Sequence, residues 1–158
     1  ACEDKLYFAM QYIAWLHDAN WPTTRNDFFF EVPWGFRNRV ANRARRQVHD
    51  ALRGQGMGRR TLQDVIALGT QVIDDLEVAL GDSLYFFGSE KPTIADVAIY
   101  AQLNHILYVD IPFNPLGDHL KTKATLVAFV DTITARYFPA IHENRAAAAM
   151  RKKQTLLK

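Results

Sequence analysis

A run of apolar residues that begins at Ile94 predicts a buried helix. Residues Ile94–Leu107 are apolar on nearly every face of a helix, which is typical of a helix at the centre of a domain. Just before this run, Thr93 and Asp96 have the spacing of a capping box. The Thr93 hydroxyl can accept a hydrogen bond from a backbone N–H one turn into the helix, and the Asp96 carboxylate can accept one from the N–H of Thr93. We therefore expect Thr93 and Asp96 to fix the start of a central helix.

A second strongly apolar segment, Glu3–Ala19, predicts the first helix of the chain. Its side chains leave little polar surface, which predicts burial on two sides, one against the core and one against a second domain or subunit. The stretch Asn20–Thr24 contains a proline and is predicted to end this helix. Residues Phe28–Phe30 should then lie in a loop and fill a gap.

Further segments have helical periodicity. Thr61 and Asp64 form a second capping box, ahead of a helix that stops at Gly81. A short helix near Leu116–Leu120 and an amphipathic helix over Ala124–Phe138 follow the central one. A helix over Pro33–Arg53 has an apolar stripe at a spacing of four residues and arginines on its other faces. The stripe is Phe36, Val40, Ala44, Val48 and Leu52, and the arginines are Arg37, Arg39, Arg43, Arg45, Arg46 and Arg53.

No segment alternates as a half-buried strand does, so the sequence predicts an all-α helical bundle with a capped, buried central helix. The predicted domain spans residues 1–139, and a basic helical tail spans residues 140–158. The net charge of +2 implies no particular partner, and Cys2 is the only cysteine, which excludes an internal disulfide. No stretch is long and apolar enough to predict a transmembrane helix.

Several ordered segments resemble the C-terminal domain of the glutathione S-transferase superfamily. There a Ser/Thr-x-x-Asp box opens the core helix, as Thr93 and Asp96 do here, after a segment similar to Tyr85–Gly88. A closer resemblance, to the bacterial branch related to the failed-axon-connections and metaxin proteins, is carried by residues Trp15–Trp21, Gln55–Arg59 and Arg136–Pro139. The resemblance covers the chain from about Glu3 to Pro139.

The resemblance implies a fold and a pocket wall rather than a complete enzyme. Superfamily members normally carry a thioredoxin-like domain before the helical one, and that domain binds most of the glutathione and activates its thiol. We expect it to be absent from this chain, so glutathione should bind only together with that missing N-terminal domain. The chain is then the helical half of a glutathione transferase-like protein, inactive alone. The metaxin resemblance implies instead a non-catalytic scaffold or assembly subunit.

Both functions imply a partner against the first helix, either a thioredoxin-like domain or a partner chain. The protein is therefore expected to be an oligomer or a complex subunit, with no nucleic-acid partner and no transmembrane segment. The expected localisation is cytoplasmic, and the alternative is mitochondrial or membrane-associated through a partner.

The resemblance also points to candidate pocket residues on the first helix, which in the superfamily lines the electrophile site. Tyr7, Gln11 and Trp15 share one face of that helix at a spacing of four. Their apolar bodies and polar tips suit an aromatic or hydrophobic ligand, although inter-domain packing alone would also account for them. Tyr108 and Phe113, after the central helix, are weaker pocket candidates.

The other reactive side chains predict no catalytic residue and no metal. The histidines have no spacing typical of a zinc or di-iron site, and His105 is expected to be a neutral core histidine bonded to a carbonyl. Nothing near Cys2 in the sequence would lower the pKa of its thiol. The arginine-rich helix has the charge to bind nucleic acid or an anionic membrane, but it is expected to present a solvated face, because no nucleic-acid motif accompanies it. An interface with an acidic partner or a second subunit is the alternative.

Overall fold

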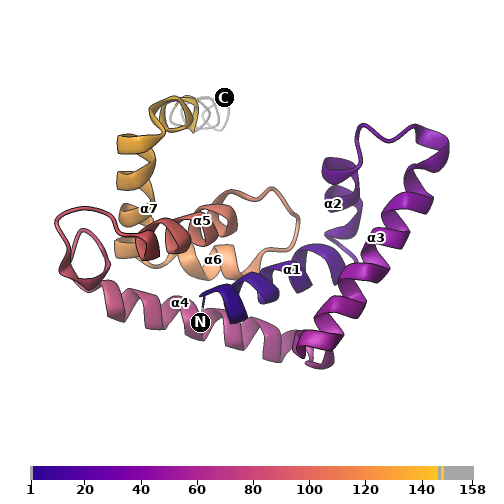
Figure 1. Ribbon diagram of the computed structural model, residues 1–158, viewed down its shortest axis with the longest axis horizontal. Helices are drawn as coiled ribbons and strands as arrows, with labels where there is room; N and C mark the ends of the chain where they lie inside the picture. Colours follow the sequence, from indigo (N-terminus) through magenta and orange to yellow (C-terminus); the bar gives the residue numbers. More distant parts are fainter. Residues whose placement is uncertain (1, 146, 148–158) are drawn as a thin grey trace, which may run out of the picture.

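The computed structural model describes residues 2–145 and 147, and this part of the chain is helical without a β-strand (Figure 1). The all-α prediction is therefore confirmed. Residues 139–145 and 147 are also helical, and residues 146 and 148–158 of the predicted tail lie outside the described residues. In chain order the elements are the π-helical turn η1 (Cys2–Leu6), α1 (Tyr7–Leu16), α2 (Trp21–Phe28), α3 (Trp34–Gln55), the 3-10 turn η2 (Met57–Arg59), α4 (Leu62–Leu80), the 3-10 turn η3 (Phe86–Gly88), α5 (Ile94–Tyr108), α6 (Pro115–Lys121) and α7 (Ala124–Tyr137).

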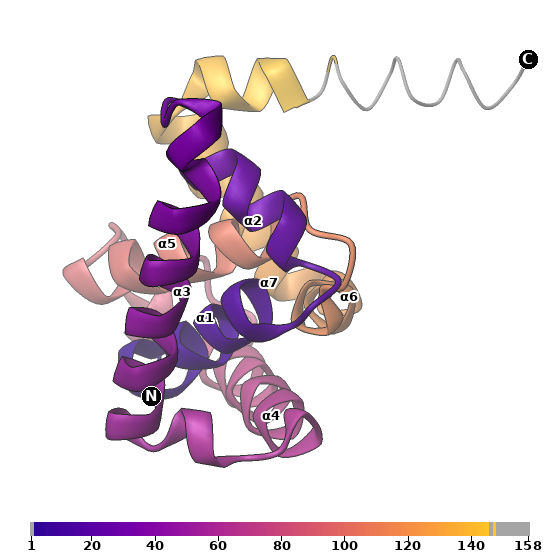
Figure 2. The ribbon, with the colours of Figure 1, turned by 90° about the vertical axis from the view of Figure 1, so that its right-hand side faces the viewer.

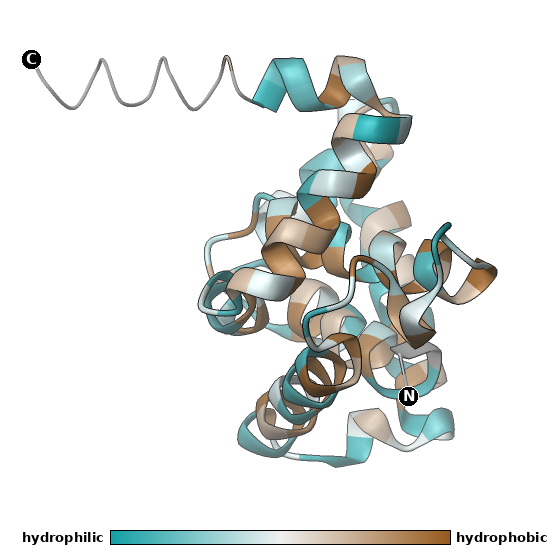
Figure 3. Ribbon diagram, turned by 90° about the vertical axis from the view of Figure 1, so that its left-hand side faces the viewer, coloured by the Kyte–Doolittle hydropathy of each residue, from teal (hydrophilic) through white to brown (hydrophobic). Residues whose placement is uncertain are grey.

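One apolar core holds these helices together. Figure 3 shows apolar and polar positions alternating along the helices, which is the pattern of amphipathic helices around a common core. Helix α1 packs on both α3 and α4, while α6 and α7 close the core against α4 and α5. The fully buried side chains of this core include Ile13 of α1, Ile73 of α4, Leu103 and Ile106 of α5, Leu120 of α6 and Val130 of α7.

Helix α5 is central on one side only. Asp96, Leu103 and Ile106 are buried, but Ile94 is 90% exposed and Val97 is 58% exposed. The prediction of burial around most of the helix was wrong for this face. An apolar composition predicts that a face prefers to be covered, but it does not say which element covers it.

A capping box opens α5. The Asp96 carboxylate accepts hydrogen bonds from the N–H of Thr93 at 2.7 Å and from its hydroxyl at 2.6 Å. It also accepts one from the N–H of Phe86 at 2.7 Å, a contact that capping alone does not predict. Asp96 therefore joins the turn η3 to the start of α5.

The chain turns between α1 and α2 earlier than predicted. Helix α1 ends at Leu16, the turn covers residues 17–20, and α2 occupies part of the stretch predicted as a break. Pro22 lies in the first turn of α2, where its missing N–H breaks no helical hydrogen bond. Phe28 ends α2 and is 65% exposed, and Phe30 is 67% exposed, so neither fills a gap.

The apolar stripe of α3 faces the core at one end only. Leu52 is 2% exposed, whereas Phe36 is 63% and Val40 is 44% exposed. A spacing of four residues advances about 40° around an α-helix at each step, so such a stripe winds away from a straight partner. Helix α3 has 22 residues and α1 has 10, so its N-terminal half extends beyond α1, as Figure 2 shows.

Arg45 of α3 does not belong to a solvated face. The Arg45 guanidinium donates to the carbonyls of Trp15 and Leu16, both at 2.8 Å, and to the Asp18 carboxylate at 2.9 Å. It also lies 4.8 Å from the centre of the Trp21 ring. Because the last carbonyls of α1 have no partner within that helix, Arg45 stabilises its C-terminal end.

Replacing Arg45 by alanine should lower the free energy of unfolding by about 1–2 kcal/mol, because these carbonyls lose a charged donor. Urea unfolding followed by circular dichroism measures this difference. The matched control is Arg46→Ala, at the exposed neighbour of Arg45, which should change the free energy of unfolding by less than about 0.5 kcal/mol. Equal midpoints for the two variants would contradict the stabilising role of Arg45.

Candidate functional site

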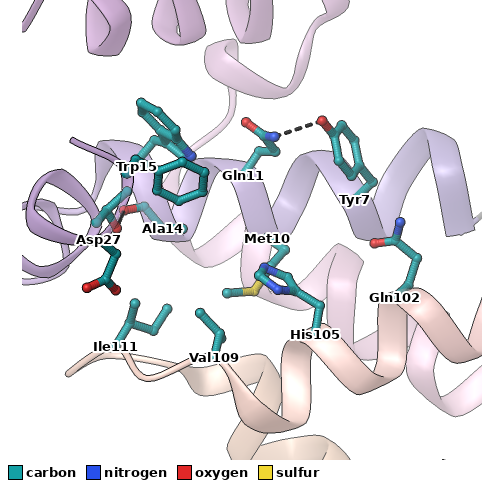
Figure 4. A pocket seen from close by; sticks show the side chains of 12 residues that line it. Tyr7, Met10, Gln11, Ala14, Trp15, Asp27, Gln102, His105, Val109 and Ile111 are labelled. Carbon is teal, nitrogen blue, oxygen red and sulfur yellow. Dashed lines mark hydrogen bonds between the residues drawn. The ribbon is translucent and has the colours of Figure 1, made fainter. Parts of the chain in front are cut away.

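A pocket of about 90 Å³ lies where α1 and α2 meet the C-terminal half of α5 and the segment after it (Figure 4). The predicted pocket residues Tyr7, Gln11 and Trp15 all line it. Met10 and Ala14 of α1 form its apolar floor together with Val109 and Ile111. The residues that complete it are Thr24, Asp27 and Phe28 of α2 and Gln102 and His105 of α5.

The α1 side of the pocket has a polar end and an aromatic end. Tyr7 and Gln11 lie one turn apart, and the Gln11 amide donates to the Tyr7 hydroxyl at 2.8 Å. The hydroxyl proton of Tyr7 and the amide oxygen of Gln11 are thus available to a ligand. At the other end, Trp15 packs against Phe28 at 5.1 Å and Trp21 at 6.0 Å between ring centres.

His105 forms the α5 side, beside Met10 (Figure 4). The expectation of a core histidine was wrong, because His105 is partly exposed and lines the pocket. Burial of the ring lowers its pKa, so the neutral imidazole is favoured at neutral pH and one ring nitrogen can accept a hydrogen bond. Spacing could have indicated this position, because Ile94, Ala98, Ala101 and His105 share one face of α5.

Tyr108 is not brought to this pocket. Its hydroxyl donates to the Asp131 carboxylate at 3.2 Å, and the Arg145 guanidinium lies 3.5 Å from its ring centre. Burial, together with the Asp131 charge, raises the pKa of the phenol. Phe113, the other weak candidate, stacks on the ring of His17 at 4.2 Å and lies outside the pocket lining.

The pocket has the chemistry of a binding site. Apolar walls and the polar atoms of Tyr7, Gln11, Gln102 and His105 can hold a small aromatic group and orient one polar substituent. None of its lining residues pairs a hydroxyl or thiol nucleophile with a hydrogen-bonded base. Its volume is below the roughly 300–1,000 Å³ of pockets that enclose a whole drug-sized ligand. It can therefore enclose only part of such a ligand.

The structure bears on the other candidate sites only within the described residues. Within them, no group of three or more histidine, cysteine, aspartate or glutamate side chains is placed to bind a metal. The side chain of Cys2 lies outside what the structure describes. No described helix combines the length and apolar character needed to cross a bilayer.

Comparison with known proteins agrees with this fold. Residues 69–133, from α4 into α7, match the family described as the glutathione S-transferase C-terminal domain. The chain is 27% identical to human Metaxin-2 over 134 residues, which are 84% of this chain and 51% of Metaxin-2. It is 34% identical to the isoprene-epoxide–glutathione S-transferase of a Rhodococcus species over 94 residues, 59% of this chain and 38% of that enzyme.

A homolog of Metaxin-1 from Caenorhabditis briggsae is 29% identical over 83 residues, 52% of this chain and 26% of that protein. The chain spans about half the length of human Metaxin-2 and less of the other relatives. No solved structure matches it.

Proposed function

We propose that this chain, which matches the glutathione S-transferase C-terminal domain family over residues 69–133 and resembles its metaxin-like branch, is the helical half of a transferase-like protein. In this proposal α1 and α5 form the wall of an electrophile pocket. The same two helices pack against a thioredoxin-like domain or a partner chain. Such a protein would be cytoplasmic, or attached to mitochondria or another membrane through its partner.

The observation that carries the proposal is that the pocket is small and that α5, which lines it, also exposes apolar side chains outside it. The pocket holds about 90 Å³, and the face of α5 that ends at His105 begins with the exposed side chains of Ile94 and Val97. On α1, Tyr7 is 40% exposed, and Phe8, Tyr12 and Trp15 are only partly buried. Exposed apolar side chains on neighbouring helices are typical of an interaction site, and a second wall beside the pocket would enlarge it.

The lining residues suggest which steps belong to this chain and which to the thioredoxin-like domain. Conjugation needs a donor within hydrogen-bond reach of the glutathione sulfur, so that the thiolate forms and attacks the electrophile. We assign that donor, and most of the glutathione contacts, to the thioredoxin-like domain. The α1 and α5 side chains would then bind the electrophile, with Trp15 against its apolar part and Gln11 and His105 near a polar substituent.

Turnover of glutathione with a generic aromatic electrophile tests this proposal. The chain alone should show no activity above the uncatalysed rate, and the chain joined to its thioredoxin-like domain should turn over. In the joined form, Gln11→Leu should lower kcat/KM by about tenfold, equivalent to about 1.4 kcal/mol for one lost hydrogen bond. Gln63→Leu, an exposed change at the start of α4, is the matched control and should leave kcat/KM unchanged.

Turnover by the chain alone would contradict the assignment of the thiol-activating donor to another domain. An unchanged kcat/KM of the joined form carrying Gln11→Leu would contradict the assignment of the α1 side chains to the pocket.

A non-catalytic scaffold is the second candidate function. The observation that favours it is coverage, because the similarity to human Metaxin-2 extends over 84% of this chain and the similarity to the transferase over 59%. The scaffold function is supported if the joined form turns over none of several electrophiles and Val97→Asp, on the exposed face of α5, abolishes its assembly with a partner chain. If the joined form does turn over, and Val97→Asp lowers turnover without abolishing assembly, the enzyme is favoured.

A further inference from the structure

The connection between α2 and α3 presents three exposed aromatic side chains at one end of the molecule. The loop of residues 29–33 and the first turn of α3 project from the body, opposite the connection between α4 and α5 (Figures 1 and 2). Phe30 is 67% exposed, Trp34 is 88% exposed and Phe36 is 63% exposed. We refer to these three residues as the aromatic tip.

The aromatic tip is held in place by the backbone contacts of Arg37. Its guanidinium donates to the carbonyl of Phe30 at 2.9 Å and to that of Val32 at 3.3 Å. The N–H of Val32 donates to the carbonyl of Phe29 at 3.1 Å, which closes the turn. The loop is therefore fixed while its aromatic rings face water. Removing such rings from water is favourable, which favours an external apolar partner.

The same hairpin is strongly basic. Residues 21–55 contain seven arginines and no lysine, against the three carboxylates of Asp27, Glu31 and Asp50, although the whole chain has a net charge of only +2. Positions three, four and seven residues apart share a helix face, so Arg39 and Arg43 lie on the face of Phe36 and Val40. All four are exposed. Aromatic side chains at the tip are thus followed along α3 by a basic, solvent-facing surface.

We propose that the aromatic tip and the exposed arginines of α3 bind this protein to the surface of an anionic lipid membrane. Aromatic side chains favour the interface between headgroups and acyl chains, and basic residues are attracted to an anionic lipid surface. The shape favours a membrane over a folded protein. The connection that carries the three exposed rings projects from the body (Figures 1 and 2), and a fluid bilayer can deform around such side chains.

Vesicle binding tests the proposal. The chain is mixed with vesicles of phosphatidylcholine containing about one third phosphatidylserine, and with vesicles of phosphatidylcholine alone, at low and at physiological salt. We expect binding to the anionic vesicles at least tenfold tighter than to the neutral ones, and weaker at the higher salt. Trp34 is the reporter, because its emission should shift to the blue and be quenched by brominated lipid. The shift should be smaller in Trp34→Phe.

Two pairs of variants locate the surface. Phe30→Ser/Trp34→Ser/Phe36→Ser should weaken binding at least tenfold, and Arg39→Gln/Arg43→Gln should weaken it about tenfold. The matched controls are Val78→Ser/Leu84→Ser/Phe87→Ser, three exposed apolar residues of α4 and its connection to α5, and Arg59→Gln/Arg60→Gln at the other end of α3. All substituted side chains are exposed, so each variant should keep the helical circular dichroism of the parent chain.

Several results would overturn the proposal. One is failure of the parent chain to bind anionic vesicles at low salt. Another is an equal loss of binding in a variant and its matched control. A third is Trp34 emission that stays unquenched in the bound state. A single-stranded RNA homopolymer that binds more tightly than the vesicles, with the same variants weakened, would assign the surface to nucleic acid instead.

Discussion

Replacing Asp96 by alanine should lower the free energy of unfolding by about 3–5 kcal/mol, the largest loss we expect from a single side chain in this protein. Asp96 is fully buried, and it accepts hydrogen bonds from the N–H of Phe86, the N–H of Thr93 and the Thr93 hydroxyl. Without the carboxylate, both backbone donors lose their partner at a covered helix end. Each unsatisfied buried group costs about 1–3 kcal/mol.

The loss should extend to the turn before α5. Phe87, which follows Phe86, has a φ of +62°, an unfavourable backbone conformation for a residue with a side chain. The hydrogen bond from the N–H of Phe86 to Asp96 anchors Phe86, the residue directly before Phe87. We therefore expect Asp96→Ala to increase hydrogen exchange at the Phe86 amide as well as to lower the urea midpoint.

The second capping box provides the control. Asp64 occupies the same position relative to Thr61, with the corresponding hydrogen bonds, but it is exposed and contacts no turn outside its helix. Asp64→Ala should therefore shift the midpoint much less than Asp96→Ala. Thr93→Ala should fall between them, since it removes a cap but leaves Asp96 bonded to Phe86. Equal shifts of the urea midpoint for both aspartate variants would mean that burial of the α5 capping box adds nothing to stability.

The features that could be predicted from the sequence are those set by short spacing. A capping box needs two side chains three residues apart, so the boxes at Thr61 and Thr93 were visible before any packing was known. The shared face of Tyr7, Gln11 and Trp15 follows from the same helical geometry, and all three residues line one pocket. Their role in binding an electrophile stays a prediction, because spacing does not identify a ligand.

The features that could not be predicted depend on where helices end relative to one another. The apolar stripe of α3 follows from spacing, but its burial does not: α3 extends beyond α1, so Phe36 and Val40 face solvent. His105 lines a pocket because α1 and α5 leave space beside it, which no property of α5 alone reveals. Arg45 resembled its neighbours in sequence, yet it alone reaches the end of α1.

Asn20 is the residue whose importance the sequence hid most completely. It lies in a stretch that looked like a simple helix break, but its side chain is fully buried. The amide donates to the carbonyl of Ile13 at 3.0 Å and to that of Phe113 at 2.7 Å, and its oxygen accepts from the N–H of Phe113 at 2.8 Å. One side chain thus joins the end of α1 to the segment after α5, 93 residues away.

Replacing Asn20 by alanine should lower the free energy of unfolding by about 2–4 kcal/mol, because the N–H and the carbonyl of Phe113 lose their partner together. Asn20→Asp should be at least as damaging, since a carboxylate oxygen would then face two carbonyls. The exposed Asn26 of α2 is the matched control, and Asn26→Ala should change stability by less than about 0.5 kcal/mol. Urea unfolding of the three variants measures these differences.

The same substitution should also reach the pocket. Val109 and Ile111, which line it, belong to the segment that Asn20 holds through Phe113. At a urea concentration where Asn20→Ala is still folded, hydrogen exchange at the Phe113 amide should rise relative to Asn26→Ala, while exchange in the middle of α4 stays unchanged. In the joined form, kcat/KM for a bulky electrophile should fall, because the wall opposite α1 is no longer fixed. Exchange that rises equally in α4 would show global destabilisation instead, and the link from Asn20 to the pocket would then be wrong.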